Sequence, residues 1–81
     1  MNSLDTLKNV FADTLALPLD GDIESLQYRE NPEWDSVAHV QLINAMERAF
    51  DVMLETNEVL DMSSFTKARE ILTTHGIVFD A

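Results

Sequence analysis

The chain has 81 residues, no cysteine and a formal net charge of −10, from five basic and fifteen acidic side chains. This length fits one domain over residues 1–81, and the lack of thiols excludes a disulfide framework and a thiolate metal site. Strong negative charge repels nucleic acids and anionic lipid and attracts basic patches on proteins, so we expect basic protein partners and no nucleic acid; solubility alone is the other explanation.

The N-terminal segment does not have the pattern of a targeting sequence. Its first twenty positions lack a basic start and an unbroken apolar run. We therefore expect neither a signal peptide nor a membrane span, and a cytoplasmic protein.

A first helix is predicted from Ser3 to Leu15. Apolar residues recur there at spacings of three and four, which line one helical face: Leu4, Leu7, Val10, Phe11, Ala12 and Leu15. Asn2 or Ser3 can cap its start, and Pro18 disfavours helical geometry at Leu17, so the helix should end before that residue.

Residues 16–35 predict a long loop. They contain both prolines and Gly21, but also apolar residues that should attach the loop to the core: Leu19, Ile23, Leu26 and Tyr28. A short helical turn near residues 23–27 is compatible with this pattern. A loop of this length in a small domain is often functional, although a missed helix would explain the segment equally well.

The second helix, from Ser36 to Phe50, has the strongest signal. It contains no Gly or Pro, and its apolar stripe has helical period, with Val40 beside it: Leu42, Ile43, Met46, Ala49 and Phe50. Asp35 is the expected N-cap, which places the hydroxyl of Ser36 in the first turn, at the positive end of the helix dipole.

Two shorter helices should follow. We expect a short third helix from Thr56 to Asp61, capped by Thr56. A last helix should run through His75, with Ser63 or Ser64 as its cap. Gly76 followed by Ile77 fits a helix stop with an apolar contact. The expected fold is all-α, a four-helix bundle with a long loop between the first two helices and a short third helix.

The histidines and acids do not form a metal-binding pattern. His39 and His75 lie in different predicted elements, and the acids around Gly21 do not have the ligand spacing of a calcium loop. Ser36 and His39 share a helix face, which permits a nucleophile-and-base interpretation. Because so short a chain offers little material for an oxyanion hole and a pocket, we expect no catalytic activity and favour a structural His39.

The second helix opens with Asp35, Ser36 and Val37 and continues with a regular set of residues: Val40, Leu42, Ile43, Ala45, Met46, Glu47, Phe50 and Asp51. This run resembles the start and register of the second helix of the acyl carrier proteins, where an Asp-Ser-Leu tripeptide opens that helix. The size, the acidic loop, the short third helix and the fourth helix are also similar, so the resemblance covers nearly the whole chain.

The resemblance implies that a phosphopantetheinyl transferase attaches 4'-phosphopantetheine from coenzyme A to Ser36. The arm would hold acyl groups as thioesters and deliver them to acyl-loading and acyl-processing enzymes of fatty acid, polyketide or other specialised biosynthesis, with the carrier expected as a monomer. The resemblance further implies a set of partner-recognition residues: Asp35, Val37, Val40, Glu47, Glu55 and Glu58. An aminoacyl or peptidyl carrier is one alternative, and an unmodified acidic helical adaptor is another.

Two features depart from the family pattern. The second helix is nearly neutral, because Glu47 is its single acid and Arg48 offsets it. The negative charge lies instead in the loop and around the third helix: Asp20, Asp22, Glu24, Glu30, Glu33, Asp35, Asp51, Glu55, Glu58 and Asp61. We therefore expect partners unlike those of primary fatty acid synthesis, and a smaller loss of partner binding on reversing Glu47 than on reversing Glu55 and Glu58 together. Trp34 before the serine is the second departure, and we favour a packing role for it.

Overall fold

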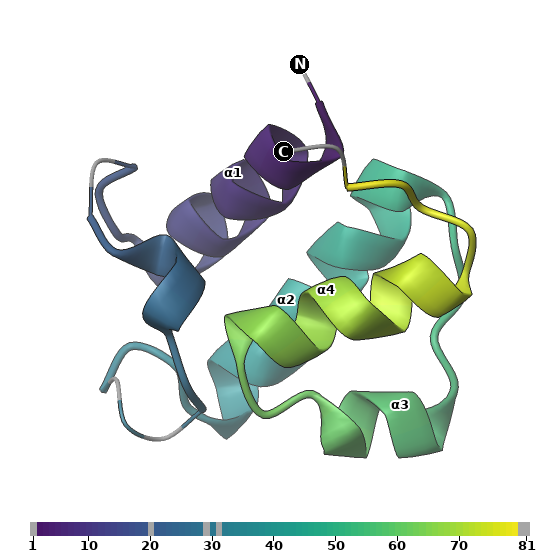
Figure 1. Cartoon of the computed structure of the whole chain (residues 1–81). Coiled ribbons are helices and arrows are strands. Elements are labelled where there is room, and N and C mark those ends of the chain that lie inside the picture. Colours follow the sequence, from purple (N-terminus) through teal and green to yellow (C-terminus); the bar gives the residue numbers. More distant parts are fainter. Residues whose placement is uncertain (1, 20, 29, 31, 80–81) are drawn as a thin grey trace.

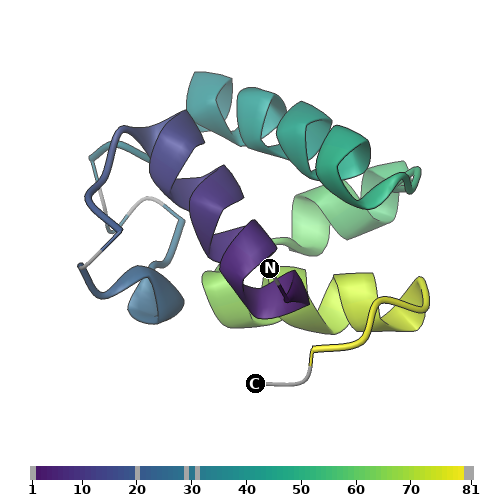
Figure 2. The same cartoon turned by 90° about the horizontal axis from the view of Figure 1, so that it is seen from above.

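The computed structural model describes residues 2–19, 21–28, 30 and 32–79. In these ranges the chain forms four α-helices and one 3-10 turn: α1 Ser3–Leu15, η1 Ile23–Ser25, α2 Ser36–Phe50, α3 Thr56–Asp61 and α4 Phe65–Thr74. The same ranges contain no β-strand, only an isolated antiparallel bridge between Gln27 and Ser64. Figures 1 and 2 show a compact, mostly helical domain in which η1 and α3 lie on opposite sides.

Side-chain caps fix where three of the helices begin. Asn2 accepts from the backbone N–H of Asp5 at 2.8 Å at the start of α1, and Asp35 accepts from Ala38 at 2.9 Å at the start of α2. Ser64 accepts from the backbone N–H of Lys67 at 3.0 Å at the start of α4. These contacts satisfy backbone donors that have no partner inside the helix, and they confirm the caps predicted from sequence.

The start of α3 differs from the sequence prediction. Its N-cap is Glu55, and Thr56 is already helical. The backbone N–H of Glu55 donates to a carboxylate oxygen of Glu58 at 2.9 Å, the reciprocal half of a capping box. The prediction of a Thr56 cap was wrong, because the side chain of Glu58 accepts from the backbone N–H of Glu55 and Glu55 is the N-cap.

Glycine ends α4 as the sequence indicated. Gly76 has a φ of 91°, its N–H donates to the carbonyl of Thr73 at 3.0 Å, and the N–H of Ile77 donates to Leu72 at 3.1 Å. These two bonds form a Schellman motif. The helix itself ends at Thr74, one residue earlier than predicted, and His75 is its C-cap.

One cluster of buried apolar residues joins α1, η1, α2 and α4, and the half-buried Val59 of α3 packs against it. Its members are Leu7, Phe11, Ala12, Leu15, Ile23, Trp34, Ala38, Leu42, Ile43, Met46, Met62, Phe65, Ala68, Ile71 and Leu72. Leu4, Val10, Leu26, Tyr28 and Phe50 are partly buried and pack against it. Two expected core residues are neither in it nor packed against it, since Leu19 is 56% exposed and Ala49 is also on the surface. Ala49 lies at the edge of the apolar stripe of α2, on a side of the helix that does not face the core.

The long loop is attached to the connection between α3 and α4. The backbone N–H of Tyr28 donates to the carbonyl of Ser63 at 2.8 Å, and the N–H of Phe65 donates to Leu26 at 3.0 Å. Ile23 in η1 is buried in the core, which confirms the predicted helical turn and its anchoring role. The loop therefore enters α2 from a fixed position, with Ser36 directly after it.

Candidate functional site

Ser36 is the first residue of α2 and is exposed to solvent. The preceding Asp35 has extended backbone, and its carboxylate is held by the backbone N–H of Ala38. This cap directs the chain into the helix and leaves the serine in the first turn. A hydroxyl so placed can be reached by a second protein.

Exposed apolar side chains accompany this serine. Val37 is 67% exposed and Val40 is 59% exposed, and the two lie one helical turn apart on α2. Single exposed apolar residues are ordinary, but those next to Ser36 give its surroundings an apolar character that a partner can contact.

Trp34 packs in the core two residues before Ser36. Its side chain is fully buried, and its ring meets Phe11 edge-on at a centroid distance of 5.3 Å. The ring of Tyr28 lies 5.9 Å away. The packing role predicted for Trp34 is confirmed, and it anchors the loop end from which α2 starts.

Both ring nitrogens of His39 have partners. The indole N–H of Trp34 lies 3.0 Å from Nδ1, and Nε2 lies 2.9 Å from the carbonyl oxygen of Val59 in α3. An indole nitrogen can only donate, so Nδ1 accepts and the ring proton is on Nε2, where it donates to Val59. His39 is half-buried in this arrangement, and neither nitrogen is directed to Ser36.

Two of the predicted recognition acids make contacts inside the protein. Glu47 accepts from the backbone N–H of Leu54 at 2.8 Å. Glu58 accepts from Glu55 and forms an ion pair with His75 at 2.9 Å. The hydrogen bonds from Glu55 and His75 hold the pKa of the Glu58 carboxyl below its ordinary value. Reversing the charge of Glu47 or Glu58 would therefore disturb the fold as well as any surface.

The remaining acids around the site are on the surface. Those before α2 are Glu30, Glu33 and Asp35, and those around α3 are Asp51, Glu55 and Asp61. Asp20, which the charge pattern also included, lies outside the described residues. Among these acids, the carboxylate of Asp35 caps α2 and that of Glu55 belongs to the capping box of α3, so Asp61 is the exposed α3 acid whose charge can be changed without removing an internal bond described above.

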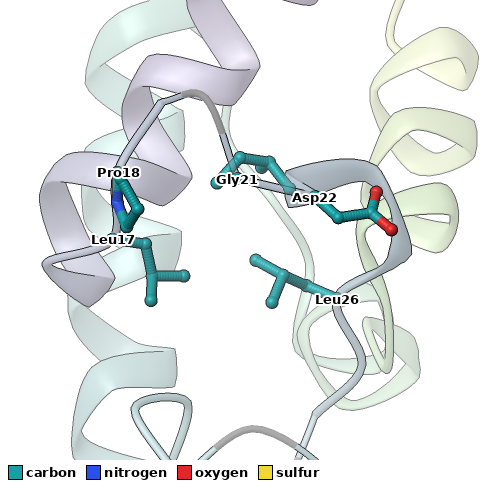
Figure 3. Close-up of a pocket in the computed structure, with 6 residues that line it drawn as sticks. Leu17, Pro18, Gly21, Asp22 and Leu26 are labelled. Atoms are coloured by element: carbon teal, nitrogen blue, oxygen red, sulfur yellow. The ribbon is translucent and has the colours of Figure 1, made fainter.

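A small hollow lies on the other side of the loop, between the end of α1 and η1. It has a volume of about 150 Å³ and is lined by Leu17, Pro18, Gly21, Asp22, Ile23 and Leu26. Figure 3 shows Leu17 and Leu26 directed toward each other across it, while the carboxylate of Asp22 points away. None of these residues belongs to α2, so the hollow and Ser36 are separate features.

Two of the contacts around the site had no sequence signal. One is the pair of hydrogen bonds that links Trp34 to His39 and His39 to Val59, and the other is the contact between Glu58 and His75. Both join elements that are separate in the sequence.

No helix within the described ranges is long and apolar enough to cross a membrane. The described side chains also include no group of three or more His, Asp or Glu placed to hold a metal ion.

Comparison of the chain with protein-family models, with curated proteins and with solved structures gave no match. The functional interpretation therefore rests on the residues and the geometry described above.

Proposed function

We propose that the chain is an acyl carrier protein in which Ser36 carries a 4'-phosphopantetheine arm. The observation that carries this proposal is the exposed Ser36 in the first turn of α2, held there by the Asp35 cap and followed by the exposed Val37. The helical fold, with a long loop before α2 and a short α3, is in keeping with a four-helix bundle of the acyl carrier type. Acyl-processing enzymes with basic surfaces are the proposed partners, and the carrier acts as a monomer in the cytoplasm.

The residues around Ser36 fit this modification. The serine oxygen is accessible, and a phosphodiester formed on it would lie at the positive end of the α2 dipole. The negative charge of Asp35 is already engaged by the N–H of Ala38, which reduces its repulsion of a phosphate. When bound, the arm supplies a thiol, which this cysteine-free chain lacks.

The proposed attachment requires no base from this chain. The oxygen of Ser36 bonds to the phosphorus of coenzyme A that bears the pantetheine, the pyrophosphate bond breaks, and adenosine 3',5'-bisphosphate leaves. The serine proton passes to a base of the transferase. His39 does not serve as that base in this proposal, because Trp34 and Val59 engage its two nitrogens.

Intact mass spectrometry tests the proposal. The protein is incubated with coenzyme A and a broad-specificity phosphopantetheinyl transferase, alongside the variants Ser36→Ala and Ser63→Ala. Ser63 is the matched control because it is exposed and Ser64, not Ser63, caps α4. We expect one phosphopantetheine on the wild type and on Ser63→Ala and none on Ser36→Ala. An unmodified wild type would refute the carrier function and favour the acidic adaptor, whereas a modified Ser36→Ala would refute the assignment of the arm to Ser36.

A further inference from the structure

His39 connects three parts of the domain that are separate in sequence. It lies in the second turn of α2, accepts from the indole of the loop residue Trp34, and donates to the carbonyl of Val59 in α3. Its ring also lies 5.0 Å from that of Tyr28. One imidazole therefore joins the end of the loop, the start of α2 and the middle of α3.

The helix α3 depends on such contacts more than the other helices do. It has six residues and no fully buried side chain: Val59 is half-buried against the core, and Leu60 is exposed. The described contacts that hold it include the bond from His39 to Val59 and the pair between Glu58 and His75. Isolated helices of this length are not stable in water, so α3 requires tertiary contacts to persist.

The bond between Trp34 and His39 exists only when the imidazole is neutral. A proton on Nδ1 would set an imidazole N–H against the indole N–H, and neither group can accept. Because Trp34 is fully buried, its N–H would then have no partner and the ring of His39 would be driven to another orientation. The same ring makes the bond to Val59, so that bond is lost with the first.

We propose that His39 is a proton-sensitive latch, which holds α3 and Trp34 to the start of α2 when neutral and releases both when protonated. Acid protonates a neutral imidazole, so the latch opens as the pH is lowered. The surface around Ser36, which includes the exposed Val40 in the next turn of α2, then changes its shape. The effect on modification of Ser36 rests on the proposed carrier function, whereas the latch itself does not.

The elements around His39 contain other titratable groups. In the described part of the elements that surround His39 they are Tyr28, Glu30, Glu33, Asp35, Glu55, Glu58 and Asp61. Asp35 is engaged by the N–H of Ala38, and Glu58 is engaged by Glu55 and His75.

The indole N–H of Trp34 reports the state of the latch directly, because Trp34 is the single tryptophan and gives one indole signal. Its chemical shift, with the Cα shifts of residues 56–61, is followed by NMR from pH 8 to pH 5. The variants are His39→Gln, which has an acceptor and a donor but does not titrate, and His75→Gln, which removes the other of the two histidines. Circular dichroism at each pH confirms that the domain stays folded.

We expect the indole signal and the α3 shifts to move together in the wild type and in His75→Gln, and to stay constant in His39→Gln. The shift should correspond to a change on the order of tenfold in the equilibrium between attached and released α3, the effect of one unpaired buried donor. An unchanged wild-type signal, or an equal change in His39→Gln, would overturn the latch.

Transferase assays at pH 6 and pH 8 then test its consequence for Ser36. The modification rate of the wild type divided by that of His39→Gln should be lower at pH 6 than at pH 8. An equal ratio at the two pH values would overturn the effect on Ser36 and leave the latch itself standing. A wild type that is not modified at any pH would instead refute the carrier function and leave the NMR result standing.

Discussion

Replacing Trp34 tests the geometry that places Ser36. In Trp34→Ala a fully buried indole is removed together with its contact to Phe11, and deletions of this kind cost about 3–5 kcal/mol. In Trp34→Phe a ring is kept, but Nδ1 of His39 loses its donor and a small cavity remains. The lost hydrogen bond costs about 1 kcal/mol, and the cavity adds about 1 kcal/mol more.

These costs are large for this domain, since stabilities of about 0.05–0.15 kcal/mol per residue give 81 residues about 4–12 kcal/mol. Urea unfolding followed by circular dichroism measures them, with the exposed Val37→Ala as the control that should change the free energy by less than about 0.5 kcal/mol. A Trp34→Ala cost no larger than that of the control would refute the anchoring role. A double-mutant cycle of Trp34→Phe with His39→Leu should show coupling of about 1 kcal/mol.

Four further substitutions test local features of the fold. Ser64→Ala should lower the unfolding free energy by about 1 kcal/mol in urea, because α4 loses its N-cap; a neutral result would contradict the capping role. The positive φ of 56° at Ala16 predicts that Ala16→Gly raises the melting temperature, whereas Gly76→Ala lowers it, and the same sign for both would contradict this reasoning. The lowered pKa of Glu58 contributes stability that is complete above the pKa of an unfolded glutamate, about 4.3, and is lost as the pH falls through the folded value. Glu58→Gln keeps an acceptor for Glu55, so its stability should depend less on pH in that range, as urea titrations at several pH values would show.

Local features of the fold were predictable from the sequence. The caps Asn2, Asp35 and Ser64 each contact a backbone N–H three residues further on, so a short window contains both partners. The spacing of the apolar residues predicted the helices for the same reason, because this pattern also lies within a short window of sequence. The wrong cap at Thr56 shows the limit of residue preferences, because Glu55 is a less favoured cap type that a reciprocal contact with Glu58 supports.

Contacts between elements could not be predicted in this way. His39 meets a carbonyl twenty positions away, and Glu58 meets His75 across seventeen positions. A pattern can show that a carboxylate is on a helix, but it cannot show that a histidine from another helix already binds it. For this reason Glu47 and Glu58 were predicted as surface recognition acids, while their internal hydrogen bonds emerged only with the fold.

The sequence led us to compare partner binding after charge reversal at Glu47 with binding after reversal at Glu55 and Glu58. Because Glu47 and Glu58 make internal hydrogen bonds, this comparison needs different residues. A loss of partner binding on reversing Glu58 would combine the loss of a surface charge with the loss of the α3 cap. Reversal of the exposed Asp61 is the more selective test of the α3 acids, with the helicity of the variant measured alongside.

Peptide mapping after incubation with coenzyme A and a phosphopantetheinyl transferase tests the central claim most directly. Trypsin releases residues 30–48 as one peptide, in which Ser36 is the only hydroxyl-bearing residue. The proposed function predicts one phosphopantetheine on this peptide, retained in Ser63→Ala and absent in Ser36→Ala. A peptide 30–48 without the added group, after a reaction in which a known carrier is modified, would contradict it.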